Sequence, residues 1–111
     1  MFCGYPELVI SEGGHTYYNS QMIVSPQGEL VNSYKKHFLY EMDKPWAEAG
    51  PSFESMELRL PRREAIIKVG LGICMDINPF NFESEFELCE FASFHKEQKS
   101  QLIIFSSAWC S

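Results

Sequence analysis

A cysteine and an aspartate end the apolar stretch VGLGICMD at residues 69–76, and these two side chains are the first candidates for chemistry. Residues two apart in an extended chain point to the same side. If the backbone does not bend after Cys74, the thiol of Cys74 and the carboxylate of Asp76 are therefore expected to share one pocket. A thiol becomes a strong nucleophile only when a nearby cation or base helps to form the thiolate.

Lys36 is the candidate cation, because the histidines of the chain do not suit a cysteine–histidine pair. His15 lies in a predicted loop, His95 lies on a predicted helix, and His37 points away from Lys36 if that strand is regular. Taken alone, a lysine in a strand is usually a solvated surface residue, and a cysteine at a strand end is usually a small buried hydrophobe. Only the combination of cysteine, lysine and carboxylate indicates an enzyme.

The elements that must position these residues begin with a hairpin. Residues 17–24 (YYNSQMIV) have the composition of a strand, the turn SPQGE follows, and residues 30–40 (LVNSYKKHFLY) have the pattern of the return strand. A second apolar run covers residues 66–76. It contains Gly70 and Gly72, which would let a neighbouring backbone come close.

A helix and a further strand follow the Asn-Pro break at residues 78–79. Residues 82–99 have helical spacing, with acidic residues first and lysines last, and residues 102–109 (LIIFSSAW) resemble another buried strand. The order strand, helix, strand predicts a right-handed parallel crossover within an α/β fold. Because the carboxyl ends of such strands line the ligand crevice, Cys74 to Asp76 should lie beside Ser106 to Trp109.

Composition limits the classes of function. The chain has 111 residues, of which 45% are hydrophobic, which suits one packed domain, and its net charge of −6 disfavours a nucleic-acid partner. No apolar run is long enough to span a membrane, and the first residues lack the pattern of a signal peptide, so we expect an intracellular, cytoplasmic protein. The four cysteines form no C-x-x-C pair, and we expect neither a metal nor a cofactor.

Two longer stretches resemble the nitrilase superfamily of carbon–nitrogen hydrolases. Residues 18–40 (YNSQMIVSPQGELVNSYKKHFLY) are similar to a family segment with a strand that ends in Tyr-Arg-Lys. Residues 70–80 (GLGICMDINPF) are similar to a family segment with a strand that ends in Cys-x-Asp. The segments CGYPE, KHFLYEMDKPWAEAG and FESEFELCEFASFH further resemble the branch of this superfamily that deamidates amino-terminal Asn and Gln. The family fold is a four-layer αββα sandwich more than twice this length. The resemblance therefore implies that residues 1–111 form a truncated part of one such domain.

The resemblance also implies a mechanism. Cys74 would attack the side-chain amide carbon of the substrate, release ammonia and leave a thioester that water hydrolyses. Lys36 would stabilise the oxyanion. An acidic residue between Lys36 and Cys74 in the sequence would support Lys36, with Glu48 as the better match and Glu41 as its rival. The family's third catalytic residue, a general-base Glu, comes from a segment that precedes the residues of this chain, so the chain alone is expected to be inactive.

Asp76 and Trp109 are the expected substrate-binding residues. The ammonium of an amino-terminal residue needs an anion to meet it, and Asp76 has suitable reach. The alternative is that Asp76 caps the turn after its strand, and both roles can coexist. Trp109 belongs to the segment SSAW, which resembles the strand end that follows the family's nucleophile.

The partner implied by the resemblance is a peptide or protein N terminus that bears Asn or Gln. Conversion of that residue to Asp or Glu would feed the N-degron pathway. Two alternatives stay open. The first is a family member that hydrolyses a small amide or carbamoyl compound, and the second is an inactive fragment or an interaction module.

Overall fold

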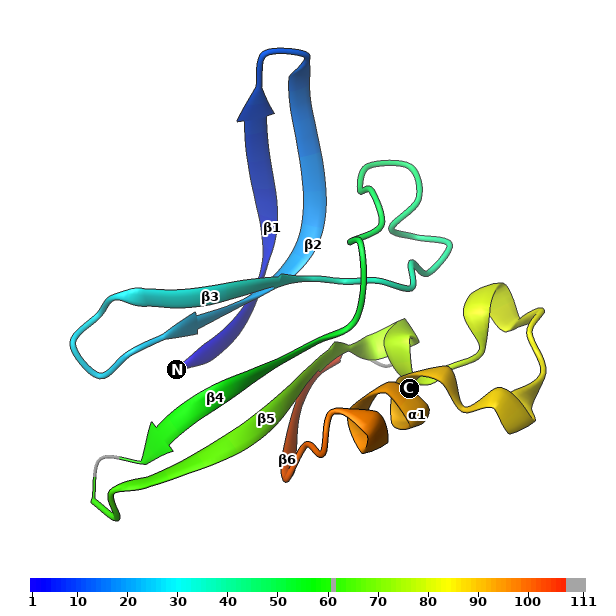
Figure 1. Cartoon of the computed structure of the whole chain (residues 1–111). Coiled ribbons are helices and arrows are strands. Elements are labelled where there is room, and N and C mark those ends of the chain that lie inside the picture. Colours follow the sequence, from blue (N-terminus) through cyan, green and yellow to red (C-terminus); the bar gives the residue numbers. More distant parts are fainter. Residues whose placement is uncertain (61, 108–111) are drawn as a thin grey trace.

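Two three-stranded β-sheets lie face to face in the computed structural model, which describes residues 1–60 and 62–107 (Figure 1). The first sheet is antiparallel and has the order β1 (Phe2–Ser11), β2 (Gly14–Val24) and β3 (Leu30–Lys35). The β1–β2 hairpin, drawn in blue, extends beyond the second sheet. Among the described residues, no helix is long and apolar enough to cross a membrane.

The second sheet is mixed. β5 (Ala65–Ile73) lies between β4 (Glu54–Leu60), which is antiparallel to it, and β6 (Leu102–Ser106), which is parallel to it. Helix α1 (Glu90–Glu97) belongs to the connection between β5 and β6. Three short 3₁₀ helices precede α1 in this connection, at Cys74–Ile77, Phe80–Phe82 and Phe86–Leu88.

The core between the sheets consists of apolar side chains from alternate strand positions. Ile23 and Tyr34 of the first sheet pack with Val69, Leu71 and Ile73 of β5, and all five side chains are buried. Alternate residues of a strand point to opposite faces. The first sheet therefore covers one face of β5, and the residues between these core positions face the other way.

The other face of β5 is covered by α1, and its glycines make room for aromatic rings. A Cβ atom at Gly70 would lie 2.5 Å from the ring of His95, and one at Gly72 would lie 2.7 Å from the ring of Phe91. The close approach predicted at these glycines is therefore present, but it is made by side chains of α1 and not by a backbone. The second apolar cluster, on this side of the sheet, comprises Phe38, Phe53, Met75 and Phe91.

The predicted hairpin is confirmed, but its return strand is shorter than expected. β2 and β3 pair around the SPQGE turn, and β3 ends at Lys35 and not at residue 40. The chain leaves the sheet there because the backbone N–H groups of His37 and Phe38 donate hydrogen bonds to the carboxylate of Asp76. Lys36 consequently lies just beyond the end of the strand.

The predicted crossover is confirmed as a parallel β5–β6 pair, whereas the predicted helix is much shorter. Helical structure was expected over residues 82–99, and α1 covers Glu90–Glu97. Cys89 adopts a left-handed backbone conformation, with φ 42°, and a right-handed helix cannot continue through such a residue. The apolar spacing of this segment predicted a helix without revealing the breaks.

The strand β1 is an element that the sequence pattern does not predict. Pro6 lies near its middle, and a proline has no backbone N–H to donate to a neighbouring strand. β1 is at the edge of the sheet, where one side of the strand needs no partner. Proline is compatible with a strand only because of that position.

Candidate active site

A cavity of about 500 Å³ lies where both sheets end, and it brings together three segments that are distant in the sequence. Lys36 follows β3, Cys74 follows β5, and Ser106 is the last residue of β6. The parallel pairing of Ile73 with Ser106 places the ends of β5 and β6 side by side. The described lining is Gly4, Asn19, Lys36, Tyr40, Met42, Asp43, Ile73, Cys74, Ser106 and Ser107.

Cys74 occupies the bend between β5 and the first 3₁₀ helix. Its backbone is left-handed, with φ 41°, a conformation that is uncommon for any residue other than glycine. Its side chain is half-buried and reaches the cavity lining. Non-glycine residues in this conformation concentrate at functional sites, where the surrounding structure holds them in place.

Lys36 is held in the wall of the cavity by an aspartate that the sequence analysis does not identify. The ammonium of Lys36 donates to Oδ2 of Asp43 at 2.5 Å, and the two residues are only 2% and 7% exposed. Two further groups donate to this carboxylate, the side-chain amide of Asn19 and the backbone N–H of Tyr40, each at 3.0 Å. A buried ion pair with these additional hydrogen bonds has a single defined geometry.

The ionisation of Asp43 follows from these contacts. Burial alone would raise the pKa of Asp43, but the hydrogen bonds from Lys36, Tyr40 and Asn19 and the charge of Lys36 together lower it below its ordinary value. The carboxylate is therefore charged at neutral pH. Its negative charge holds the ammonium of Lys36 in the wall of the cavity, where a fixed positive charge can stabilise an oxyanion.

The structure does not bring Glu48, the expected support of Lys36, or its rival Glu41 to that lysine. Both residues are exposed, and Asp43 is the carboxylate that contacts Lys36. The backbone N–H of Glu48 instead donates to the carbonyl of Tyr17, in an isolated bridge beside β2. The contacts that place Asp43 are local. Its backbone N–H donates to the carbonyl of Tyr40, and its carboxylate accepts the N–H of Tyr40. This turn brings the carboxylate of Asp43 to Lys36.

The structure does not place Asp76 in the cavity. The backbone bends at Cys74, so the two side chains do not share one side of a strand, and Asp76 is fully buried. Its carboxylate accepts hydrogen bonds from four protein groups. The geometry supports the alternative role of a structural carboxylate at the turn and not the binding of a substrate ammonium. Burial raises the pKa of Asp76, and the N–H groups of Phe38 and Ile73 and the hydroxyl of Tyr34 partly offset that effect.

Of the segment Ser106 to Trp109, which was expected beside the nucleophile, Ser106 and Ser107 are described. Ser106 lines the cavity, and its hydroxyl oxygen lies 2.7 Å from Nε2 of the fully buried Gln21. Trp109 lies outside the described residues, so its assignment as a substrate-binding residue stays a prediction. The neighbouring Ser107 is exposed and also lines the cavity.

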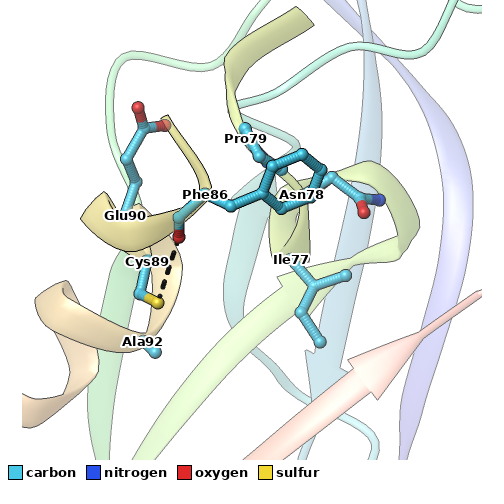
Figure 2. A pocket seen from close by; sticks show the side chains of 7 residues that line it. All are labelled: Ile77, Asn78, Pro79, Phe86, Cys89, Glu90 and Ala92. Carbon is cyan, nitrogen blue, oxygen red and sulfur yellow. Dashed lines mark hydrogen bonds between the residues drawn. The ribbon is translucent and has the colours of Figure 1, made fainter. Parts of the chain in front are cut away.

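A second cavity, of about 400 Å³, does not have the same chemistry (Figure 2). It contains Cys89, whose Sγ lies 3.3 Å from the carbonyl oxygen of Phe86, and its one charged side chain among the described lining residues is that of Glu90. Figure 2 shows apolar side chains, including those of Ile77 and Phe86, around the opening. The described lining of this cavity contains no lysine or arginine, whereas the cavity that Cys74 lines also contains Lys36.

Comparison with known proteins gives a consistent set of relatives, although no family model matches the chain. A protein N-terminal amidase of Schizosaccharomyces pombe is 41% identical, over 96% of this chain and 40% of its own length. Crystal structures of an N-terminal amidase with Asn-Glu-Ala and Gln-Val peptides are 31% identical, with a TM-score of 0.86. They match over 97% of this chain and 28% of theirs.

A more distant structure shows the fold alone. The NitN amidase of Neterenkonia sp. AN1 is 17% identical, with a TM-score of 0.64, and the match covers all of this chain and 38% of that one. The comparisons confirm the predicted resemblance and the predicted fold class, a part of a nitrilase-type α/β structure. The chain spans less than half the length of each of these relatives.

Proposed function

We propose that residues 1–111 form the part of an amidase domain that carries the nucleophile Cys74 and the oxyanion-stabilising Lys36. In this proposal the full-length protein deamidates amino-terminal Asn and Gln residues. The observation that carries the proposal is that both side chains line one cavity, in which the buried carboxylate of Asp43 holds the ammonium of Lys36. The similarity to N-terminal amidases over 96% of the chain supports the substrate class.

The first chemical step is the attack of the Cys74 thiolate on the side-chain amide carbon. A carbon–sulfur bond forms, and the electron pair of the carbonyl moves to oxygen, which becomes an oxyanion. The ammonium of Lys36 stabilises this charge. A preorganised cation in a largely buried site is most effective at this point, because it needs no rearrangement as the charge develops. Asp43 keeps that ammonium in place before the substrate arrives.

Collapse of the intermediate breaks the carbon–nitrogen bond. The nitrogen leaves as ammonia after it receives a proton, and Cys74 remains acylated as a thioester. Water then attacks the thioester carbon, which yields the side-chain carboxylic acid and regenerates the thiol. The substrate residue is thereby converted from Asn to Asp, or from Gln to Glu, with one water consumed and one ammonia released.

Proton transfer in both steps needs a general base, and the described lining offers no free candidate. Asp43 is its one carboxylate, and it already accepts hydrogen bonds from Lys36, Asn19 and Tyr40. A base with these contacts would have to release Lys36 in order to act. We therefore retain the general-base Glu that the family resemblance implies, as a residue of the full-length protein.

The decisive experiment measures ammonia release by the full-length protein from a peptide that begins with Asn. Free asparagine and the same peptide with an acetylated N terminus are the comparison substrates. We expect turnover of the free-amine peptide, poor turnover of the other two, and loss of activity in Cys74→Ser and Lys36→Met. A protein that prefers free asparagine would instead be a small-amide hydrolase, and one that releases no ammonia from any amide would refute the amidase assignment.

The biological setting is also part of the proposal. Deamidation of a protein N terminus creates an acidic first residue, which would feed N-degron turnover, and we place this reaction in the cytoplasm. Fractionation of cells that express the tagged full-length protein tests the location. Recovery with an organelle fraction would contradict it.

A further inference from the structure

We propose that Asp76 is a positioning residue that fixes the nucleophile Cys74 relative to the Lys36 segment. This inference rests on the proposed function, because it assigns Asp76 a role in assembling the Cys74–Lys36 pair. It replaces the expected role of Asp76 in binding the substrate ammonium. Asp76 would act through the two residues it holds and would not touch the substrate.

The evidence is the way in which the two carboxylate oxygens divide their contacts. Oδ1 accepts the backbone N–H groups of His37, at 3.1 Å, and Phe38, at 2.8 Å. Oδ2 accepts the hydroxyl of Tyr34, at 2.7 Å, and the backbone N–H of Ile73, at 2.9 Å. One oxygen thus holds the two residues that follow Lys36, and the other holds the residue that precedes Cys74.

These contacts lie where regular pairing ends. β3 ends at Lys35 and β5 ends at Ile73, and Cys74 then takes its left-handed conformation. The two strands belong to different sheets, so no ladder of backbone hydrogen bonds joins Lys36 to Cys74. Asp76 therefore links the segment that follows β3 to the end of β5, although the two strands belong to different sheets. Its complete burial keeps water from competing for these four donors.

The substitution Asp76→Asn tests this arrangement without a large change in shape. An amide has one acceptor oxygen, and its NH₂ group cannot accept a hydrogen bond. If the oxygen keeps the N–H groups of His37 and Phe38, the NH₂ group faces Tyr34, whose hydroxyl can turn to accept, and the N–H of Ile73, which cannot. The less costly orientation therefore leaves the donor of Ile73 unpaired, directly before Cys74.

Tyr34→Phe is the matched control. It removes one donor from the same carboxylate oxygen, yet the buried ring and all three backbone contacts of Asp76 remain. A general sensitivity of the core to lost hydrogen bonds would affect both variants to a similar extent. Positioning through the backbone predicts that Asp76→Asn is much the more harmful of the two.

The experiment measures alkylation of Cys74 by iodoacetamide in the full-length protein, without substrate, by mass spectrometry of the labelled peptides. Cys89 is the internal reference, because it is exposed and lies in the second cavity (Figure 2). We expect the ratio of Cys74 to Cys89 labelling to fall about tenfold or more in Asp76→Asn, since the thiolate loses its place beside Lys36. We expect it to stay within about threefold in Tyr34→Phe.

Kinetics separate positioning from substrate binding. We expect Asp76→Asn to lower kcat equally for an Asn-leading peptide and a simple amide, with KM unchanged, because a misplaced nucleophile harms every substrate. A loss confined to the free-amine peptide, or a labelling ratio that does not fall, would overturn the inference. If the wild-type protein hydrolyses no amide, the proposed function fails, while the labelling experiment still tests Asp76.

If Asp76→Asn does not fold, hydrogen exchange in the wild-type protein decides the matter. The amides of His37 and Phe38 lie beyond the end of β3, and their acceptor is Asp76. We expect them to exchange as slowly as the amides inside β2. Exchange at the rate of exposed loop amides would show that the carboxylate does not hold this segment.

Discussion

The substitution Asp43→Asn should disable Lys36 while leaving the shape of the site almost unchanged. In the native protein Oδ2 of Asp43 accepts from Lys36 and from the N–H of Tyr40, and Oδ1 accepts from Asn19. An amide oxygen in the place of Oδ2 can keep the first two contacts, and the side chain of Asn19 can turn to meet the new NH₂ group. What the variant loses is the negative charge beside a buried ammonium.

The size of the effect follows from burial. Lys36 is 2% and Asp43 is 7% exposed, so solvent screens their interaction little. A hydrogen bond to a charged group contributes about 1.5–3 kcal/mol, which corresponds to about a tenfold to a hundredfold change in an equilibrium or rate. Without its counterion the buried ammonium is no longer held in one position, and a cation that is not preorganised stabilises an oxyanion poorly. Asp43→Ala, which leaves the charge of Lys36 uncompensated, should cost about 3–5 kcal/mol of unfolding free energy.

The assay is ammonia release from an Asn-leading peptide by the full-length protein, together with urea unfolding of each variant. We expect kcat to fall about tenfold to a hundredfold in Asp43→Asn. Glu48→Gln is the matched control, because Glu48 is exposed and the contact recorded for it is made by its backbone N–H. It should retain the native kcat and stability. Equal damage in both variants, or an unchanged kcat in Asp43→Asn, would refute the assignment of Asp43 as the support of Lys36.

Three further predictions concern the chain itself. Burial lowers the pKa of His95 below its ordinary 6.5, so the unfolded state takes up the proton first. The free energy of unfolding should therefore fall as the pH drops through 6.5, and His95→Phe should reduce that fall in urea titrations. Gly72→Ala should cost about 1–3 kcal/mol in the same assay, because its Cβ would meet two aromatic rings at under 3 Å, whereas Gly13→Ala, in open space, should be neutral. The 111-residue chain alone should release no ammonia from an Asn-leading peptide, and turnover there would make Asp43 the general base.

The sequence predicts the strands better than the segments between them. A run such as residues 66–73 is almost entirely apolar because one face packs on a sheet and the other on a helix, and that pattern is visible without a structure. Residues 82–99 mislead because their spacing fits a helix throughout, while left-handed residues such as Cys89 divide it. Backbone conformations of this kind depend on what the segment packs against, which a local pattern does not record.

The same contrast explains which parts of the site could be predicted. Cys74 and Ser106 lie at the ends of neighbouring parallel strands, so strand assignment was sufficient to bring them to one crevice. Lys36 was predicted inside a strand, and only its chemistry and the family resemblance linked it to Cys74. The carboxylates that support Cys74 and Lys36 cannot be found in this way. Asp43 and Asp76 act where the chain departs from regular structure, and four of the seven groups that donate to them are backbone N–H groups. Every residue except proline has a backbone N–H, so the sequence does not indicate which of these groups donates to a carboxylate. Periodicity can therefore locate the nucleophile at its strand end, but the carboxylates that hold Cys74 and Lys36 in place require coordinates, or the variants proposed for each.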